Sequence, residues 1–172
     1  TGVEREPVRS IDPSRSLASL RFDGAPAQLL GDAASGWAVV QKLLDRAAVL
    51  MAFEQVGSAT RAFEMTREYT LGRYAFGRSI ASFQAIRHKA VDMLHHLELA
   101  RVAAHYAAWA SDVDDPSREH AVAMAKSYVG EAAVYVASED IQIHGGVGFT
   151  WDCDAHFYFK RAKQNDTMLG YQ

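Results

Sequence analysis

The sequence has only one cysteine, Cys153, among 172 residues. A single cysteine cannot form an internal disulfide framework, and it fits a reducing compartment. Long hydrophobic runs are also missing: the longest purely apolar stretch, residues 47–53, is far shorter than the ~20 residues of a membrane-spanning helix. Basic residues do not exceed acidic ones, with 18 against 21 and a net charge of −3, so nothing indicates nucleic acid or an anionic membrane as a partner. We therefore expect a soluble, cytoplasmic protein.

Proline is scarce as well, with four residues, at positions 7, 13, 26 and 116. Proline is the strongest breaker of a helix interior, and the two long proline-free stretches are rich in Ala, Leu, Met, Glu and Arg, which favour helices. Hydrophobic residues make up 49% of the chain, which is ordinary for a globular protein. The composition therefore permits long helices around a common core.

The first 30 residues have a different pattern. Apolar and polar side chains alternate from Ala18 to Phe22, which predicts a half-buried strand. Val3, Val8 and Ile11 indicate another strand. One or two strands do not form a stable sheet alone, so this segment is either the end of a missing β-domain or is paired with another part.

From Gly36 onward, apolar residues recur at helical spacing. The pattern predicts helices from Gly36 to about Tyr69 with Ser35 as N-cap, from Phe83 to just before Asp112, from Asp115 and Pro116 to Ile143, and from Asp154 to about Asp166. Short loops between long helices favour an antiparallel up-down bundle. We therefore predict a mostly α fold whose inner faces are rich in alanine, with a short N-terminal β segment.

Two loops could carry chemistry. The glycine-rich segment 144–149 follows a helix, whereas a dinucleotide-binding glycine turn follows a strand, so taken alone it reads as a helix-ending loop or as a point of close backbone approach to a ligand. Residues 73–78 form a basic, aromatic loop, either a solvated arginine pair or a phosphate clamp. His95 and His96 are adjacent and lack metal-ligand spacing, so no metal site is expected.

Two segments together resemble the C-terminal helical domain of acyl-CoA dehydrogenases. Residues 73–86 read RYAFGRSIASFQAI, and residues 141–149 read IQIHGGVGF. The resemblance runs from about Gly31 to the end, and the preceding LASLRFDGAPAQLLG resembles the last strand of the family's middle β-domain. It implies a β-domain remnant with a linker in residues 1–30 and a helical-bundle domain in residues 31–172.

The resemblance also implies a cofactor. Family enzymes hold FAD across a dimer interface, where the C-terminal domain of one subunit grips the adenosine pyrophosphate end of its neighbour's FAD. Carried onto this chain, Arg73, Phe76 and Gln84 would contact the pyrophosphate and ribitol region. Gln142, Gly145 and Gly146 would meet the adenosine side.

The sequence departs from the family at the catalytic base. The family reaction is α,β-dehydrogenation of an acyl-CoA thioester, in which a glutamate removes the α-proton. Leu169, within residues 167–171, stands where most members have that glutamate, and Ala47 stands where a second group has it. Ala48 occupies a position that is often an arginine helping to hold the thioester substrate.

This combination resembles the non-catalytic subunits of heteromeric α2β2 acyl-CoA dehydrogenases of actinobacteria, which often act on CoA-linked steroid side chains. It implies a homologous partner subunit that brings the glutamate, an acyl-CoA substrate and, as electron acceptor, an electron-transfer flavoprotein. The chain is about half the length that the family needs, so it is either a fragment or is completed by a partner.

Two alternatives stay open. Glu54 lies two helical turns from Ala47 on roughly the same face, so it could serve as an unusual base in a catalytically competent enzyme. The chain could also be a helical scaffold subunit that no longer binds the cofactor.

Overall fold

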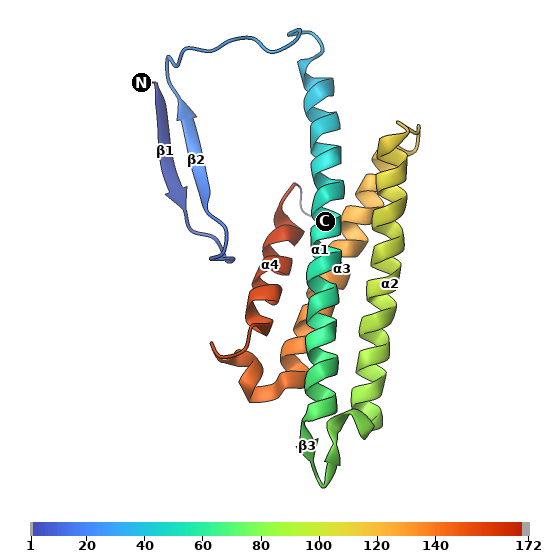
Figure 1. The fold of residues 1–172 in the computed structure, drawn as a ribbon. Coiled ribbons are helices and arrows are strands. Elements are labelled where there is room, and N and C mark those ends of the chain that lie inside the picture. Colours follow the sequence, from blue (N-terminus) through green and yellow to red (C-terminus); the bar gives the residue numbers. More distant parts are fainter. Residues whose placement is uncertain (1, 170–172) are drawn as a thin grey trace.

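The computed structural model describes residues 2–169, and most of them lie in an elongated helical bundle (Figure 1). Helices α1 (Gly36–Gly72), α2 (Gln84–Asp112) and α3 (Arg118–His144) alternate in direction, and the shorter α4 (Ala155–Thr167) packs against α3 and α1. The prediction of a mostly α, antiparallel up-down bundle is confirmed. Within the described residues, no helix is both long and apolar enough to cross a bilayer.

Alanine dominates the interior of the bundle, as predicted. Fully buried alanines from the three long helices include Ala52, Ala62, Ala104 and Ala132. Small side chains let helix axes approach closely, because the interaxial distance depends on the residues at the contact. Larger buried side chains, such as Met93, fill the remaining space.

The start of α3 differs from the predicted one, and the predicted N-cap residue of α1 lacks a capping side-chain bond. Helix α3 begins at Arg118, and its N-cap residue is Ser117, not the predicted Asp115. The carboxylate of Asp115 accepts hydrogen bonds from the backbone N–H and the hydroxyl of Ser117. This local side-chain bond is an alternative to the helical backbone pattern, so the chain makes a turn at Pro116. Ser35 is the N-cap residue of α1, but its side chain makes no capping hydrogen bond.

The predicted linker between α1 and α2 is a small hairpin. Strands β3 (Tyr74–Ala75) and β4 (Arg78–Ser79) pair antiparallel, and the 3₁₀ helix η1 (Ile80–Ser82) leads into α2. The segment after α3 is a second 3₁₀ helix, η2 (Gly145–Phe149). Gly145 has φ +63°, a left-handed conformation that glycine adopts without strain, and so ends α3 as expected.

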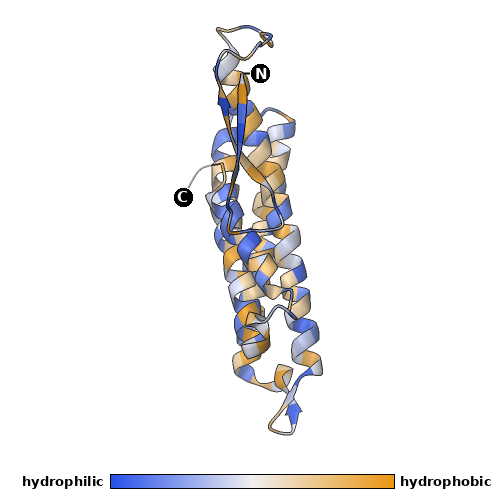
Figure 2. Cartoon of the chain, turned by 90° about the vertical axis from the view of Figure 1, so that its left-hand side faces the viewer, coloured by the Kyte–Doolittle hydropathy of each residue, from blue (hydrophilic) through white to orange (hydrophobic). Residues whose placement is uncertain are grey.

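The first residues form a separate β-hairpin beside the bundle. Strands β1 (Val3–Val8) and β2 (Leu17–Phe22) pair antiparallel, with Val3 opposite Phe22. Hydrophobic residues lie among hydrophilic ones along both strands (Figure 2), and apolar side chains such as Val3, Leu20 and Phe22 are exposed. The hairpin therefore presents apolar surface and unpaired strand edges within the described chain.

An ionic network fixes the turn of this hairpin to the bundle. The carboxylate of Asp12 is fully buried and accepts hydrogen bonds from Arg161 of α4 and from Ser14. Arg161 also donates to Glu54 of α1 at 2.9 Å, and Arg15 pairs with the same carboxylate. A buried charge must be paired to be tolerated, so these residues determine where the hairpin meets the bundle.

The network lowers two pKa values. Burial opposes ionisation of Asp12, but hydrogen bonds from Ser14 and Arg161 outweigh it and hold the pKa of Asp12 below its ordinary 3.8. Glu54 behaves in the same way: desolvation is outweighed by Arg15 and then Arg161, and its pKa lies below its ordinary 4.5. Both carboxylates therefore stabilise the fold fully above these ordinary values and lose that contribution as the pH falls towards the lowered folded pKa.

We predict that Asp12→Asn destabilises the protein at neutral pH by about 1–3 kcal/mol, because Arg161 loses a charged hydrogen-bond partner. We also expect the variant's stability to fall less steeply than that of the wild type below pH 4.5. Urea unfolding of the purified protein at pH 7 and pH 4 measures both effects. Asp23→Asn, at an exposed carboxylate, is the matched control, and equal losses in the two variants would contradict the prediction.

Candidate functional site

Arg73 lies where α1 ends and the β3–β4 hairpin begins. Its backbone N–H donates to the carbonyl of Tyr69 at 2.8 Å, and its own carbonyl accepts the N–H of Ile80 at 2.8 Å. The backbone of Arg73 is thus held on both sides. Its side chain is exposed and makes no ion pair within residues 2–169, so its guanidinium donors face solvent.

Phe76 is at the tip of this hairpin and is 95% exposed. Its φ of +53° is uncommon for a residue with a bulky side chain, and the turn with Gly77 imposes it. Its ring lies edge-on to Phe83 with the centroids 6.3 Å apart, and the guanidinium of Arg78 lies 4.0 Å from the Phe83 centroid. The tip therefore presents an aromatic side chain outward beside positive charge.

Gln84 is the first residue of α2, and its side chain is exposed. The first backbone N–H groups of a helix lack intrahelical partners and carry the positive end of the helix dipole. Arg73, Phe76 and Gln84 therefore come from one continuous segment that combines a guanidinium, an aromatic ring and an amide near a helix N-terminus.

The second group of predicted residues follows the last turn of α3. Gln142 is exposed in that turn, and Gly145 and Gly146 begin η2 with exposed backbone. An added Cβ at Gly145 or Gly146 would meet no heavy atom within 4 Å, whereas one at Gly148 would lie 2.6 Å from the carbonyl of Ile141. Gly148 is thus required by the chain's own packing, while the missing side chain of Gly146 leaves open surface.

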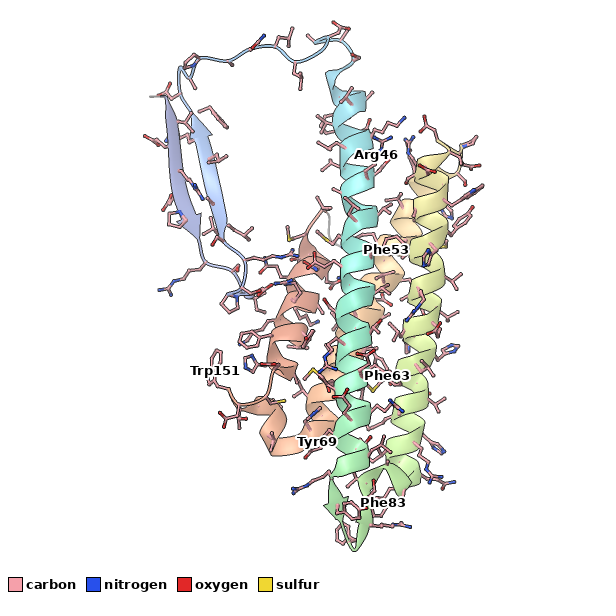
Figure 3. All side chains as sticks on the ribbon, viewed as in Figure 1. Arg46, Phe53, Phe63, Tyr69, Phe83 and Trp151 are labelled. Atoms are coloured by element: carbon pink, nitrogen blue, oxygen red, sulfur yellow. The ribbon has the colours of Figure 1, made fainter. Side chains whose placement is uncertain are left out.

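The structure brings these two groups to the same end of the bundle. The ring of Tyr69, one turn before Arg73, stacks on His144 at a centroid distance of 4.3 Å, and its hydroxyl lies 3.4 Å from the carbonyl oxygen of His144. Tyr69 and Phe83 lie near this end in Figure 3. The six predicted cofactor-binding residues therefore belong to two neighbouring segments that α1 and α3 hold together.

The two expected base positions carry no proton acceptor. Leu169 lies in the turn after α4, with φ +61° and a half-exposed side chain, and residues 170 and 171 of the same segment lie outside the described residues. Ala47 is half-buried in α1 and Ala48 is buried. Aliphatic side chains at these places cannot remove a proton.

Glu54, the alternative base, is held by two guanidinium groups, those of Arg15 and Arg161. Its lowered pKa makes it a weaker base than an ordinary glutamate. Sequence reasoning missed this arrangement, and it also missed Asp12, because the partners of Asp12 on α4 lie about 150 positions away. No local pattern signals a pairing over such a separation.

Within the described residues, no group of three or more His, Cys, Asp or Glu side chains is arranged to hold a metal ion. We call the end of the bundle that carries the β3–β4 hairpin the hairpin end. Its polar groups are mainly hydrogen-bond donors: a guanidinium, amides and backbone N–H groups. Such a set suits an anionic or hydrogen-bond-accepting ligand.

Comparison with known proteins identifies the family of this fold. A family model described as the C-terminal domain of acyl-CoA dehydrogenase matches residues 34–171. The acyl-CoA dehydrogenase IpdE2 of Mycolicibacterium smegmatis is 39% identical over 165 residues, which cover 96% of this chain and 48% of the relative. IpdE2 of Mycobacterium tuberculosis is 37% identical over 169 residues, covering 98% and 48%. The chain thus spans about half the length of these curated relatives.

Solved structures show the same fold. Butyryl-CoA dehydrogenase from Megasphaera elsdenii superposes with a TM-score of 0.92 at 26% identity, covering 99% of this chain and 45% of the other. The Tcur3481–Tcur3483 steroid ACAD superposes with a TM-score of 0.86 at 30% identity, covering 99% and 45%. The chain therefore belongs to the acyl-CoA dehydrogenase family, and residues 34–171 correspond to its C-terminal domain.

Proposed function

We propose that this chain is a non-catalytic part of an FAD-dependent acyl-CoA dehydrogenase, in which it grips the cofactor while a homologous subunit supplies the catalytic glutamate. The observation that carries the proposal is one contrast. Arg73, Phe76 and Gly146 are exposed and uncommitted at one end of the bundle, whereas residues 47 and 169 carry only aliphatic side chains.

The residues at the hairpin end fit the adenosine pyrophosphate part of FAD. A guanidinium can donate two parallel hydrogen bonds to phosphate oxygens, and Arg73 has no competing carboxylate among the described residues. Gln84 adds an amide at the N-terminus of α2, where negative charge is favoured. The open surface at Gly145 and Gly146 allows a ligand to approach the backbone, with Gln142 beside it.

Bound FAD would supply the acceptor for the hydride that leaves the β-carbon of the acyl-CoA. The chain's own residues would bind and orient this cofactor and would not move the α-proton, because Leu169 and Ala47 have no basic atom. Ala48 likewise offers no charge to the thioester substrate. Glu54 is committed to Arg15 and Arg161.

The N-terminal hairpin supports the need for a further part. Its exposed apolar side chains and unpaired edges fit the rim of a larger β-domain, in line with a division into a β-domain remnant in residues 1–30 and a bundle domain in residues 31–172. The remaining half of the family fold would come from further sequence or from the partner, in a heterotetramer.

For the substrate we propose an acyl-CoA with a steroid-derived side chain. The support is the 30% identity and TM-score of 0.86 to the Tcur3481–Tcur3483 steroid ACAD. An electron-transfer flavoprotein would reoxidise the flavin. The assembled enzyme would act in the cytoplasm.

Arg73→Ala is expected to weaken FAD binding in the assembled protein about 10- to 100-fold, since a charged hydrogen bond contributes about 1.5–3 kcal/mol. Arg73→Lys should give an intermediate loss, because lysine keeps the charge without the planar fork. Flavin fluorescence on dilution measures the dissociation constant. Arg61→Ala, on α1 and paired with Glu64 and Glu68, is the control, and unchanged FAD retention in Arg73→Ala would favour the scaffold alternative.

The purified chain alone is expected to show no acyl-CoA oxidation, and turnover should appear when the partner is added. Dye reduction with a steroid-side-chain CoA substrate measures the rate.

Glu54→Gln in the assembled enzyme should leave kcat within about twofold of the wild-type value, because this carboxylate holds the turn of the N-terminal β1–β2 hairpin and does not act as the base. Robust turnover by the lone chain, or loss of turnover in a normally folded Glu54→Gln variant, would contradict the proposal.

A further inference from the structure

Four side chains connect the last turns of α1 to the last turn of α3, and we call them the Tyr69–His144 joint: Thr66, Tyr69, Asp140 and His144. The hydroxyl of Thr66 donates to Oδ1 of Asp140 at 2.7 Å. Nδ1 of His144 lies 3.0 Å from the same Oδ1 and 2.8 Å from the carbonyl oxygen of Asp140. The ring of Tyr69 covers His144 at an interplanar angle of 29°.

The three polar residues of the joint, Thr66, Asp140 and His144, are buried, and the ring of Tyr69 is partly buried. Asp140 is 0% exposed and His144 is 7% exposed. The hydrogen bond to Asp140 raises the pKa of His144 although burial lowers it, which favours the protonated imidazolium. Oδ2 of Asp140 is buried without a hydrogen-bond partner among the described residues. The donors on Oδ1 therefore carry the stabilisation of this carboxylate, and displacing α1 from α3 would remove the Thr66 hydroxyl and leave His144 alone to pair with it.

The joint lies directly between the two groups of cofactor-facing residues. The carbonyl of Tyr69 accepts the N–H of Arg73, and the Tyr69 hydroxyl approaches the carbonyl of His144. His144 immediately precedes Gly145, where the chain turns with φ +63°. A movement of the His144 ring would thus be passed to the backbone at Gly145 and Gly146.

We propose that Asp140 and His144 are positioning residues that fix the Gly145–Gly146 backbone relative to Arg73, so that both segments reach one FAD molecule. Neither residue needs to touch the cofactor, since both are buried. This inference rests on the proposed cofactor role of the hairpin end and adds the residues that align its two halves.

A neighbouring ion pair provides a matched control. Glu139 precedes Asp140 on α3 and pairs with Lys89 of α2, so it also connects two helices. Its carboxylate pairs with α2 and not with the joint, and a purely structural effect of losing one interhelical pair should appear in Glu139→Ala as well.

The test uses the full chain bound to its partner, with Asp140→Ala, Asp140→Asn and Glu139→Ala compared with the wild type. Two readouts are followed: the FAD dissociation constant from flavin fluorescence, and amide hydrogen exchange along the chain. Asp140→Ala should weaken FAD binding on the order of tenfold and speed exchange in residues 145–149. Asp140→Asn should restore most of the FAD affinity and of the slow exchange, because an amide oxygen still accepts hydrogen bonds from Thr66 and His144. Glu139→Ala should change neither the FAD affinity nor the exchange in residues 145–149.

The failures are distinguishable. Unchanged FAD affinity and unchanged exchange in Asp140→Ala overturn the joint, while a loss of FAD in Arg73→Ala keeps the proposed function. Unchanged FAD affinity in Arg73→Ala overturns the proposed function itself. Faster exchange throughout α2 in Asp140→Ala, with no restoration by Asp140→Asn, overturns the positioning role in favour of a general loss of stability.

Discussion

Close helix packing on alanine is the constraint on which the rest of the structure depends. Ala52, Ala59 and Ala62 of α1 and Ala132 and Ala133 of α3 are all buried in one cluster. Methyl side chains let these helices approach closely, and this approach brings the end of α1 within hydrogen-bond reach of α3. A wider spacing would separate the two loops that follow these helices, and no surface residue could compensate for it.

In the proposed assembly, binding and proton transfer belong to different chains. The polar groups at the hairpin end are aimed outward, while the acidic groups inside the bundle, such as Glu54 and Asp140, are already paired. The lowered pKa of Glu54 makes this carboxylate poorly suited to accept a proton. The same reasoning explains why the aliphatic residues at positions 47 and 169 matter more than the presence of other glutamates.

Much of the fold was predictable because it follows from local patterns: the strand around Leu20 and the helices from apolar spacing and scarce proline. The start of α3 was not, because Asp115 and Ser117 make a turn first and the helix begins only at Arg118. Local chemistry alone read the glycine and arginine loops as helix-ending and solvated, and the family motif changed that interpretation. The pairings of Asp12 and Asp140 could not be predicted, since a single sequence holds no signal for contacts between distant helices.

The pairing of Asp12 with Arg161 has a consequence for synthesis of the chain. The two residues are 149 positions apart, so Asp12 lacks its guanidinium partner until α4 has been made, and until then Arg15 can anchor the turn only to Glu54 of α1. At 5–20 residues per second this delay lasts about 7–30 s. During that interval the apolar strands of the nascent hairpin lie open to chaperones or to a co-translated partner, and the full ionic network at the hairpin turn forms only when α4 joins it.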